Sequence, residues 1–302
     1  MTTRVADIYA PLRRMARRVL IRFPRIDRAL GRQLAGIDAR LHELGILRAF
    51  DRSGVVRWEG FDIHFERADA NLARQLYLNN EYEPATSEAI LRNLRPGSTF
   101  VDLGAHIGVF SMLAARCVGE DGHVFAFEPV PRTRRVLERN IAANNLTNIC
   151  VVPFATSDKR ETLSFISTNA SEANGVAVAN DAWPRINVNA TDLDSYFRDR
   201  NWPSISLVKM DVEGQELPTL RGMKELLSRT GRPPIIFEYN LDQLRRTGTS
   251  RSALFDLLYA YGYSAYDVMF RTSVQLRLPE ELETLHAHAS RANVNIMARS
   301  GP

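Results

Sequence analysis

The sequence contains little cysteine and no long apolar run. Its two cysteines, Cys117 and Cys150, are in neither a metal-ligand nor a C-x-x-C spacing. This argues against a disulfide framework and favours a reducing compartment such as the cytoplasm. No stretch approaches the roughly 18 consecutive apolar residues of a membrane-spanning helix. The apolar segment VLIRF near the N-terminus is too short and too interrupted for a signal-peptide core. With 45% hydrophobic and 25% charged residues among 302, the composition is that of an ordinary globular protein.

Lysine is absent from the first 50 residues, which instead hold eleven arginines. With four acidic residues this segment carries a charge of +7, so the rest of the chain carries 4 − 7 = −3. Its arginines alternate with apolar residues at roughly helical spacing, and Pro24 interrupts the pattern. We therefore predict a helical, arginine-rich N-terminal extension over residues 1–50. It would either pack as a cap with a basic face in solvent or lie on an anionic membrane surface as a peripheral contact.

From residue 51 onward the hydrophobic pattern alternates between strands and helices. Residues 55–66 indicate a hairpin and residues 83–94 a helix, so residues 51–98 are predicted to lead into the core. Residues 99–302 then repeat the βα unit that builds a parallel sheet. The predicted strands are 99–104, 123–128, 149–154, 204–211, 234–240, 263–268 and 293–299, and the predicted helices are 108–118, 132–144, 215–228 and 251–261. Residues 160–190 break the rhythm and predict an inserted hairpin near the sheet edge.

The segment FVDLGAHIG, residues 100–108, has the pattern of a strand that ends in a tight turn against a ligand. Gly104 and Gly108 are present, but the central glycine of a G-x-G-x-x-G dinucleotide loop is missing. Asp102 would repel a pyrophosphate and attract an ammonium. Glu128, at the end of the next predicted strand, is placed to accept both hydroxyls of a ribose. Because S-adenosylmethionine carries both a ribose and an ammonium, these residues favour it over NAD.

Three segments resemble the FkbM-type S-adenosylmethionine-dependent methyltransferases: FVDLGAHIGVFS, FAFEPVPRTRRVLERNIAANNL and LVKMDVEGQELPTLRGM. The resemblance covers about residues 80–240. It implies the α/β, Rossmann-like fold of class I methyltransferases, a seven-stranded and mostly parallel sheet with helices on both faces and an antiparallel last strand. It also implies a cofactor site, whose candidate residues are Asp102, Gly104, His106, Gly108, Glu128 and, near the adenine, Asp158.

The resemblance further implies O-methylation of a hydroxyl on a sugar, a glycolipid or a polyketide-like natural product. Lys209, Asp211 and Glu213 alternate at the end of a predicted strand and so point to one face. We predict that the two acids face the acceptor hydroxyl, one as base or orienting group. Lys209 would keep them ionised or contact the cofactor. No metal is expected, and the open alternative is a divalent cation held by the two acids and Glu238.

Other functions stay open on the sequence alone. The arginine-rich N-terminus supports methylation of RNA or protein, but the Asn/Asp-Pro-Pro-aromatic signature of N-methyltransferases is missing where KMDVEG stands. A non-catalytic module that binds a nucleoside or a membrane is a further hypothesis, and an NAD-dependent oxidoreductase is another. We expect a small-molecule, glycan or lipid acceptor and no nucleic acid partner. The expected location is the cytoplasm or the inner membrane surface, and no oligomeric state is predicted.

Overall fold

The computed structural model describes residues 48–166, 175, 177, 183–229, 231–250, 252–269, 274–276 and 294–300. They divide into two compact units, residues 48–84 and residues from 85 onward. Apart from its last three residues, the predicted arginine-rich extension lies outside the described residues. Among the helices that the structure describes, none has the length and apolar character needed to span a membrane.

The N-terminal unit is a β-hairpin packed with a helix. β1 (Gly54–Trp58) pairs antiparallel with β2 (Phe61–Phe65), which confirms the hairpin predicted over residues 55–66. The 3-10 helices η1 (Arg48–Asp51) and η2 (Arg67–Asp69) flank this hairpin. Sequence analysis did not predict the helix α3 (Ala70–Asn79), which packs on β1. The ring of Phe50 lies against Phe65 and against Tyr77 of α3, so the unit has a small aromatic core of its own.

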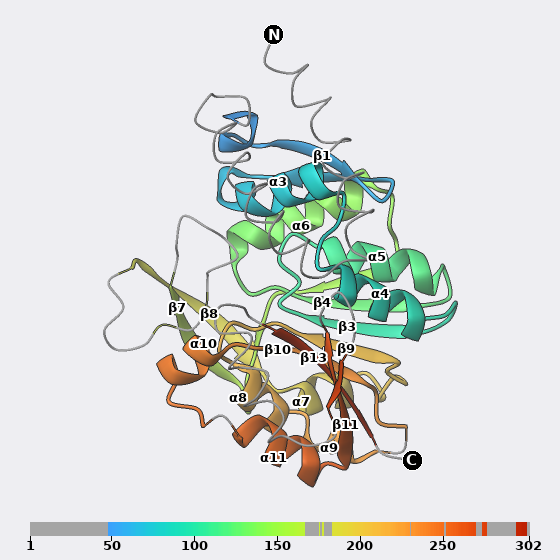
Figure 1. The fold of residues 1–302 in the computed structure, drawn as a ribbon, viewed down its shortest axis with the longest axis vertical. Coiled ribbons are helices and arrows are strands. Elements are labelled where there is room, and N and C mark those ends of the chain that lie inside the picture. The colour runs from blue at the N-terminus through green and yellow to red at the C-terminus, as the bar shows by residue number, and fades with distance from the viewer. Residues whose placement is uncertain are drawn as a thin grey trace. The chain divides into compact units, whose positions relative to one another are not determined.

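An eight-stranded sheet of order β12-β11-β13-β10-β9-β3-β4-β5 is the frame of the larger unit (Figure 1). Its parallel strands are β3 (Thr99–Leu103), β4 (His123–Phe127), β5 (Ile149–Val152), β9 (Leu207–Met210) and β10 (Ile235–Tyr239). β13 (Val294–Ser300) lies antiparallel between β10 and β11 (Tyr263–Met269). These seven strands confirm the predicted class I methyltransferase sheet with its antiparallel last strand. The short β12 (Val274–Leu276) is an unpredicted eighth strand at the edge.

Helices cover both faces of this sheet (Figure 1). One face carries α4 (Pro84–Asn93), α5 (Val109–Val118) and α6 (Pro131–Ala143). The opposite face carries α7 (Leu193–Arg198), α8 (Glu216–Arg221), α9 (Lys224–Ser228) and α11 (Ala253–Ala260). Val101, Leu103, Val208 and Met210 belong to the main core with residues of this second helix set. Because successive strand side chains alternate between faces, residues 102 and 209 point to the first helix set.

The prediction of one continuous helix over residues 215–228 is wrong. These residues form two short helices, α8 and α9. The buried carboxylate of Asp194 accepts hydrogen bonds from the backbone N–H groups of Glu225 (2.7 Å) and Leu226 (2.9 Å), so it caps α9 separately. A Cβ at Gly222 would clash with the carbonyl oxygen of Ser157. Close packing at Gly222 and the cap from Asp194 therefore determine where α8 ends and α9 begins.

The inserted hairpin predicted within residues 160–190 is confirmed. β7 (Glu161–Ile166) and β8 (Arg185–Thr191) pair antiparallel. They form a separate three-stranded sheet, of order β6-β8-β7, with β6 (Ala155–Thr156). Between β7 and β8, Gly175 accepts a hydrogen bond from the N–H of Ile166 (2.8 Å), and the N–H of Ala177 donates to Ser164 (2.7 Å). These bonds anchor residues 175 and 177 on β7.

Candidate functional site

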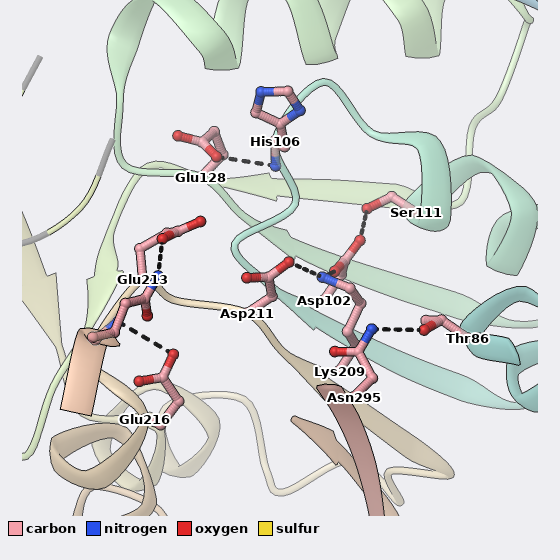
Figure 2. A network of polar contacts seen from close by, with 12 residues as sticks. Thr86, Asp102, His106, Ser111, Glu128, Lys209, Asp211, Glu213, Glu216 and Asn295 are labelled. Carbon is pink, nitrogen blue, oxygen red and sulfur yellow. Dashed lines mark hydrogen bonds and ion pairs between the residues drawn. The ribbon is translucent and has the colours of Figure 1, made fainter. Parts of the chain in front are cut away.

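The predicted site residues gather at the carboxyl ends of β3, β4 and β9 (Figure 2). Asp102 of β3 is paired in register with Lys209 of β9, and Leu103 with Phe127 of β4. Residues paired in register share a face of the sheet, so the polar side chains converge although they are far apart in sequence. Open α/β sheets bind their ligands beyond such strand ends. The polar residues at these three strand ends therefore lie in one region, while their roles stay a prediction.

The turn after β3 is closed by backbone contacts on two sides. The N–H groups of Gly104 and Ala105 donate to the carbonyl oxygen of Phe127 at 3.0 and 2.9 Å. The N–H of Asp211 donates to the carbonyl oxygen of Leu103 at 3.0 Å. Gly104 has φ +79°, and a Cβ there would clash with the carbonyl oxygen of Asp211. Both the left-handed backbone and the lack of space require glycine at this position.

Glu128 is fixed by the same turn. Its Oε2 accepts a hydrogen bond from the backbone N–H of His106 (3.0 Å), and its Oε1 accepts one from the N–H of Val130 (2.8 Å). The side chain is buried, and burial raises its pKa to about 8 against the lowering effect of these two bonds. Since each carboxylate oxygen has a second lone pair, Glu128 keeps acceptor capacity for a ligand's hydroxyls.

Asp102 is fully buried beside Lys209. Its Oδ2 accepts a hydrogen bond from Ser111 Oγ of α5 at 2.6 Å, whereas its Oδ1 accepts none from the residues that the structure describes. Lys209 Nζ lies 3.9 Å from that Oδ1 and 3.2 Å from Asp211 Oδ2. Burial raises the pKa of Asp102, and the Lys209 ammonium opposes that rise. A buried carboxylate oxygen with this spare capacity suits a cationic ligand group.

The turn after β9 carries a cluster of acids. Asp211, Glu213 and Glu238 of β10 each offer a carboxylate oxygen within 4.8 Å of the others, and all three are partly buried. Gln243, on α10 (Leu241–Arg246), donates a side-chain N–H to Glu213 Oε2. Burial, followed by repulsion from Asp211, Glu238 and Glu216, raises the pKa of Glu213 to about 9. Burial and the neighbouring acids therefore favour the protonated form of Glu213.

The remaining predicted residues are His106, Gly108 and Asp158, and they differ in whether they contact this region. His106 contacts the site through its backbone N–H on Glu128. Gly108 begins α5 with φ +93°. Asp158 is exposed and has no hydrogen bond or ion pair to the residues above in the described structure, while the neighbouring Ser157 is buried and donates to Glu161 (2.6 Å). The adenine role of Asp158 stays a prediction.

Sequence reasoning missed several polar residues of the site. Ser111, which bonds to Asp102, lies nine residues after it in the segment FVDLGAHIGVFS. Its place in that segment was the sequence feature that could have identified it. Asn295 of β13 donates to Thr86 of α4 at 3.0 Å, a contact between residues 209 positions apart that no local pattern indicates (Figure 2). Gln243 was missed because the short α10 was not predicted.

The comparison with protein families decides the family. Residues 102–265 match the model described as the methyltransferase FkbM domain, which is more than half of the 302 residues. The chain belongs to the FkbM methyltransferase family. The match begins at Asp102 and includes Glu128, Lys209, Asp211 and Glu213, so the region described above lies within the FkbM domain.

A curated relative of this FkbM-family chain is methyltransferase sdnD of Sordaria araneosa. The two are 27% identical over an alignment of 166 positions, and the match covers 45% of this chain and 64% of that protein. This chain thus matches less than two thirds of the relative's length. The name of sdnD gives methyl transfer as its reaction class, in agreement with the family match of this chain.

Solved structures resemble the FkbM-family chain loosely. The SAM-dependent O-methyltransferase from Thermotoga maritima aligns with a TM-score of 0.42 at 11% identity, over 82% of this chain and 78% of that one. Aeropyrum pernix fibrillarin, in complex with natively bound S-adenosyl-L-methionine, aligns with a TM-score of 0.41 at 14% identity, over 82% of each chain. At TM-scores below 0.5, neither likeness supports a functional inference. The fold is established by the strand order and the family match.

The residues of the FkbM domain fit S-adenosylmethionine. The spare oxygen of the buried Asp102 suits an ammonium, and the fixed Glu128 carboxylate suits ribose hydroxyls. The absence of side chains at Gly104 and Gly108 leaves the backbone of the turn accessible to a close ligand. The donor and acceptor groups at the ends of β3 and β4 therefore complement the charge pattern of this cofactor.

Proposed function

We propose that this protein is an S-adenosylmethionine-dependent O-methyltransferase that acts on a hydroxyl of a sugar, a glycolipid or a polyketide-like natural product. The observation that supports this most is the division of the acids between neighbouring strand ends. Asp102 and Glu128 are buried and held by hydrogen bonds, as a cofactor site requires. Asp211 and Glu213 are partly exposed and clustered, as a site that removes a proton requires.

The residues at the first two strand ends would hold the cofactor. Glu128 would accept hydrogen bonds from the ribose hydroxyls, and Asp102 Oδ1 would accept one from the ammonium. When bound, S-adenosylmethionine supplies an electrophilic methyl group on a sulfonium. Its displacement is favoured when the acceptor oxygen is held in line with the methyl carbon.

The residues after β9 would prepare the acceptor. A hydroxyl must lose its proton on methylation, and Asp211 or Glu213 is placed to take it or to orient the oxygen. The Lys209 ammonium lies 3.2 Å from Asp211 Oδ2 and forms an ion pair with it. The alternative is a divalent cation bound by Asp211, Glu213 and Glu238, and loss of turnover on chelation with EDTA would reveal it.

The surroundings of the acids favour oxygen over nitrogen as the acceptor atom. The strand that ends in KMDVEG offers carboxylates where N-methyltransferases carry an Asn/Asp-Pro-Pro-aromatic segment. We accordingly propose a small-molecule, glycan or lipid partner and no nucleic acid partner. Peripheral membrane contact through the arginine-rich N-terminus is a separate prediction, tested by co-sedimentation of the full chain with anionic vesicles.

The first experiment is calorimetric titration with S-adenosylhomocysteine, with NAD as control. We expect binding of the first that Glu128→Ala abolishes, and no binding of the second. The protein would then be incubated with methyl-labelled S-adenosylmethionine and a panel of sugars, glycolipids and hydroxylated polyketides, with RNA and protein as further arms. Label on a hydroxyl acceptor supports the proposal. NAD binding, or label only on RNA or protein, contradicts it.

A further inference from the structure

Three asparagines, spaced four residues apart, connect α6 and the loop after it to the turn and helix that follow β3. Asn140 donates its side-chain amide to the carbonyl oxygen of Ile107 in the turn, at 2.8 Å. Asn144 donates to Met112 Sδ of α5 at 3.6 Å. Asn148 donates to two carbonyl oxygens at the end of α5, at 2.9 and 2.7 Å. Asn140 therefore bonds to the turn of the proposed cofactor site, and Asn148 to the opposite end of α5.

The side chain of Asn140 is fully buried against this turn. A buried amide is costly unless it is hydrogen-bonded, and the bond to Ile107 offsets that cost. Leu137, three residues earlier on the same helix face, fills the space beside Gly108, where a Cβ would lie 2.4 Å from Leu137 Cδ1. Helix α6 thus packs on the turn through one apolar and one polar side chain.

The carbonyl group of Ile107 lies outside the hydrogen-bond ladder of α5. The helix begins at Val109 with Gly108 as its N-cap, and the Gly108 carbonyl oxygen accepts the N–H of Met112 at 2.9 Å. Ile107 precedes these residues and is fully buried. A buried carbonyl group that lacks a donor costs free energy comparable to a lost hydrogen bond. Asn140 supplies a donor from another helix.

The peptide group between Ile107 and Gly108 is held at both ends. Its carbonyl oxygen accepts the amide described above, and its N–H donates to the carbonyl oxygen of Ala105 at 2.9 Å. His106, directly before it, has φ +53°, a left-handed conformation that is uncommon for a non-glycine residue. The His106 N–H donates to Glu128 Oε2 at 3.0 Å (Figure 2). A rotated peptide group would let His106 leave this conformation, and its N–H would then leave Glu128.

We propose that Asn140 is a positioning residue for cofactor binding, whose amide holds the Ile107 carbonyl oxygen and thereby keeps the turn in the shape that fixes Glu128. This inference rests on the proposed binding of S-adenosylmethionine at Glu128. Two backbone N–H groups hold that carboxylate, those of His106 and Val130, and Asn140 supports the first. An acceptor that is fixed before the ligand arrives loses little conformational freedom on binding, which favours affinity.

Asn140→Leu nearly keeps the size of the side chain and removes its donor. We expect the dissociation constant for S-adenosylhomocysteine, measured by calorimetry, to rise by about 10- to 100-fold, because a buried carbonyl group of the turn loses its partner. Asn148→Leu is the matched control. It removes two hydrogen bonds at the other end of α5, so it should also lower the midpoint of denaturant unfolding but leave the dissociation constant unchanged. Equal losses of affinity in both variants would mean a general effect of stability and would overturn the inference.

The route through Glu128 is tested in a second background. Glu128→Gln leaves one acceptor oxygen for the two N–H groups of His106 and Val130, so the bond that Asn140 supports is already weakened. In that background Asn140→Leu should raise the dissociation constant by about threefold or less. The same factor as in the wild-type background would refute action through Glu128. In turnover assays, Asn140→Leu should raise the KM for S-adenosylmethionine about tenfold or more and keep kcat within about threefold.

A second variant serves if Asn140→Leu does not fold. Asn140→Asp keeps the shape of the side chain and can donate to the Ile107 carbonyl oxygen only when it is protonated. Its affinity for S-adenosylhomocysteine, relative to that of the wild type at the same pH, should therefore fall between about pH 5 and pH 9. A ratio that stays at one throughout contradicts the inference.

Binding and turnover together separate this inference from the proposed function. If Asn140→Leu binds S-adenosylhomocysteine as tightly as the wild type does, the positioning role fails and the proposed function stands. If the affinity falls as expected but no hydroxyl of the panel is methylated, the proposed acceptor fails and the role of Asn140 stands. A wild type that does not bind S-adenosylhomocysteine overturns both.

Discussion

The turn after β3 and the turn after β9 have similar backbones and different electrostatics. Both use left-handed residues, with φ +79° at Gly104 and +93° at Gly108 in the first, and +53° at Glu213 and +99° at Gly214 in the second. The first turn donates backbone N–H groups to Phe127 and Glu128 and is held rigidly. The second carries clustered acids, and side chains from α10 hold it.

On the proposed function, the two adjoining strand ends divide the reaction between them. Backbone bonds and fully buried acids give the first turn a fixed shape that suits a cofactor of constant structure. Partly exposed, clustered acids give the second turn a chemistry that suits removal of a proton. The following substitutions test whether the two turns are separable.

The largest effect is expected from Gly104→Ala, which breaks the contact between the two turns. The new Cβ would clash with the Asp211 carbonyl oxygen, so one turn must move. We expect a loss of about 4 kcal/mol or more in the free energy of unfolding, and loss of S-adenosylhomocysteine binding. Gly231→Ala is the matched control, because Gly231 has φ +77° with nothing within 4 Å and should lose about 1–2 kcal/mol. Equal losses of unfolding free energy in the two variants would show that the close packing of the two turns at Gly104 does not contribute to stability.

Asp211→Asn should affect turnover and spare the cofactor. The amide cannot accept the acceptor's proton, so turnover should fall by about 10²–10⁴-fold. Calorimetry should give an unchanged affinity for S-adenosylhomocysteine, because the first turn is intact. The exposed Asp256→Asn on α11 is the control and should change neither quantity. A parallel loss of affinity in Asp211→Asn would mean that both turns belong to the cofactor site.

Glu128→Gln should show the reverse pattern. It replaces one of two oxygen acceptors, so the affinity for S-adenosylhomocysteine should fall about tenfold. The folded pKa of about 8 lies above the ordinary value of 4.5, so wild-type stability should decline from pH 4.5 through pH 8. In the variant that decline should be smaller. Glu138→Gln, at an exposed position of α6, should keep the wild-type affinity and the wild-type pH dependence.

The smallest effect is expected from Ser111→Ala. It removes the buried 2.6 Å hydrogen bond to Asp102 and should lower the free energy of unfolding by about 1–3 kcal/mol. Ser228→Ala removes an exposed hydroxyl that donates to Lys224 and should stay within about 0.5 kcal/mol. Denaturant unfolding of both variants measures the difference. Equal values would show that Ser111 does not hold Asp102.

Much of the fold could be predicted because its signals are local. Strand and helix periods located the seven principal strands, and the acids at strand ends followed from them. The break between α8 and α9 could not be predicted, because Asp194 caps the second helix from about 30 residues away. The six residues of α10 carry too little periodicity to stand out, so its contact with Glu213 was hidden as well.

The sequence by itself determined which side chains meet at the strand ends. Strand side chains alternate, and the carboxyl ends of parallel strands align, so Asp102, Glu128 and Lys209 had to converge once the strands formed. The tertiary structure alone decided how the protons and hydrogen bonds are shared among them. Burial in the folded chain raises the pKa values of Asp102, Glu128 and Glu213. The fold also pairs Asp211 with Lys209 and brings the amide of Gln243 to Glu213.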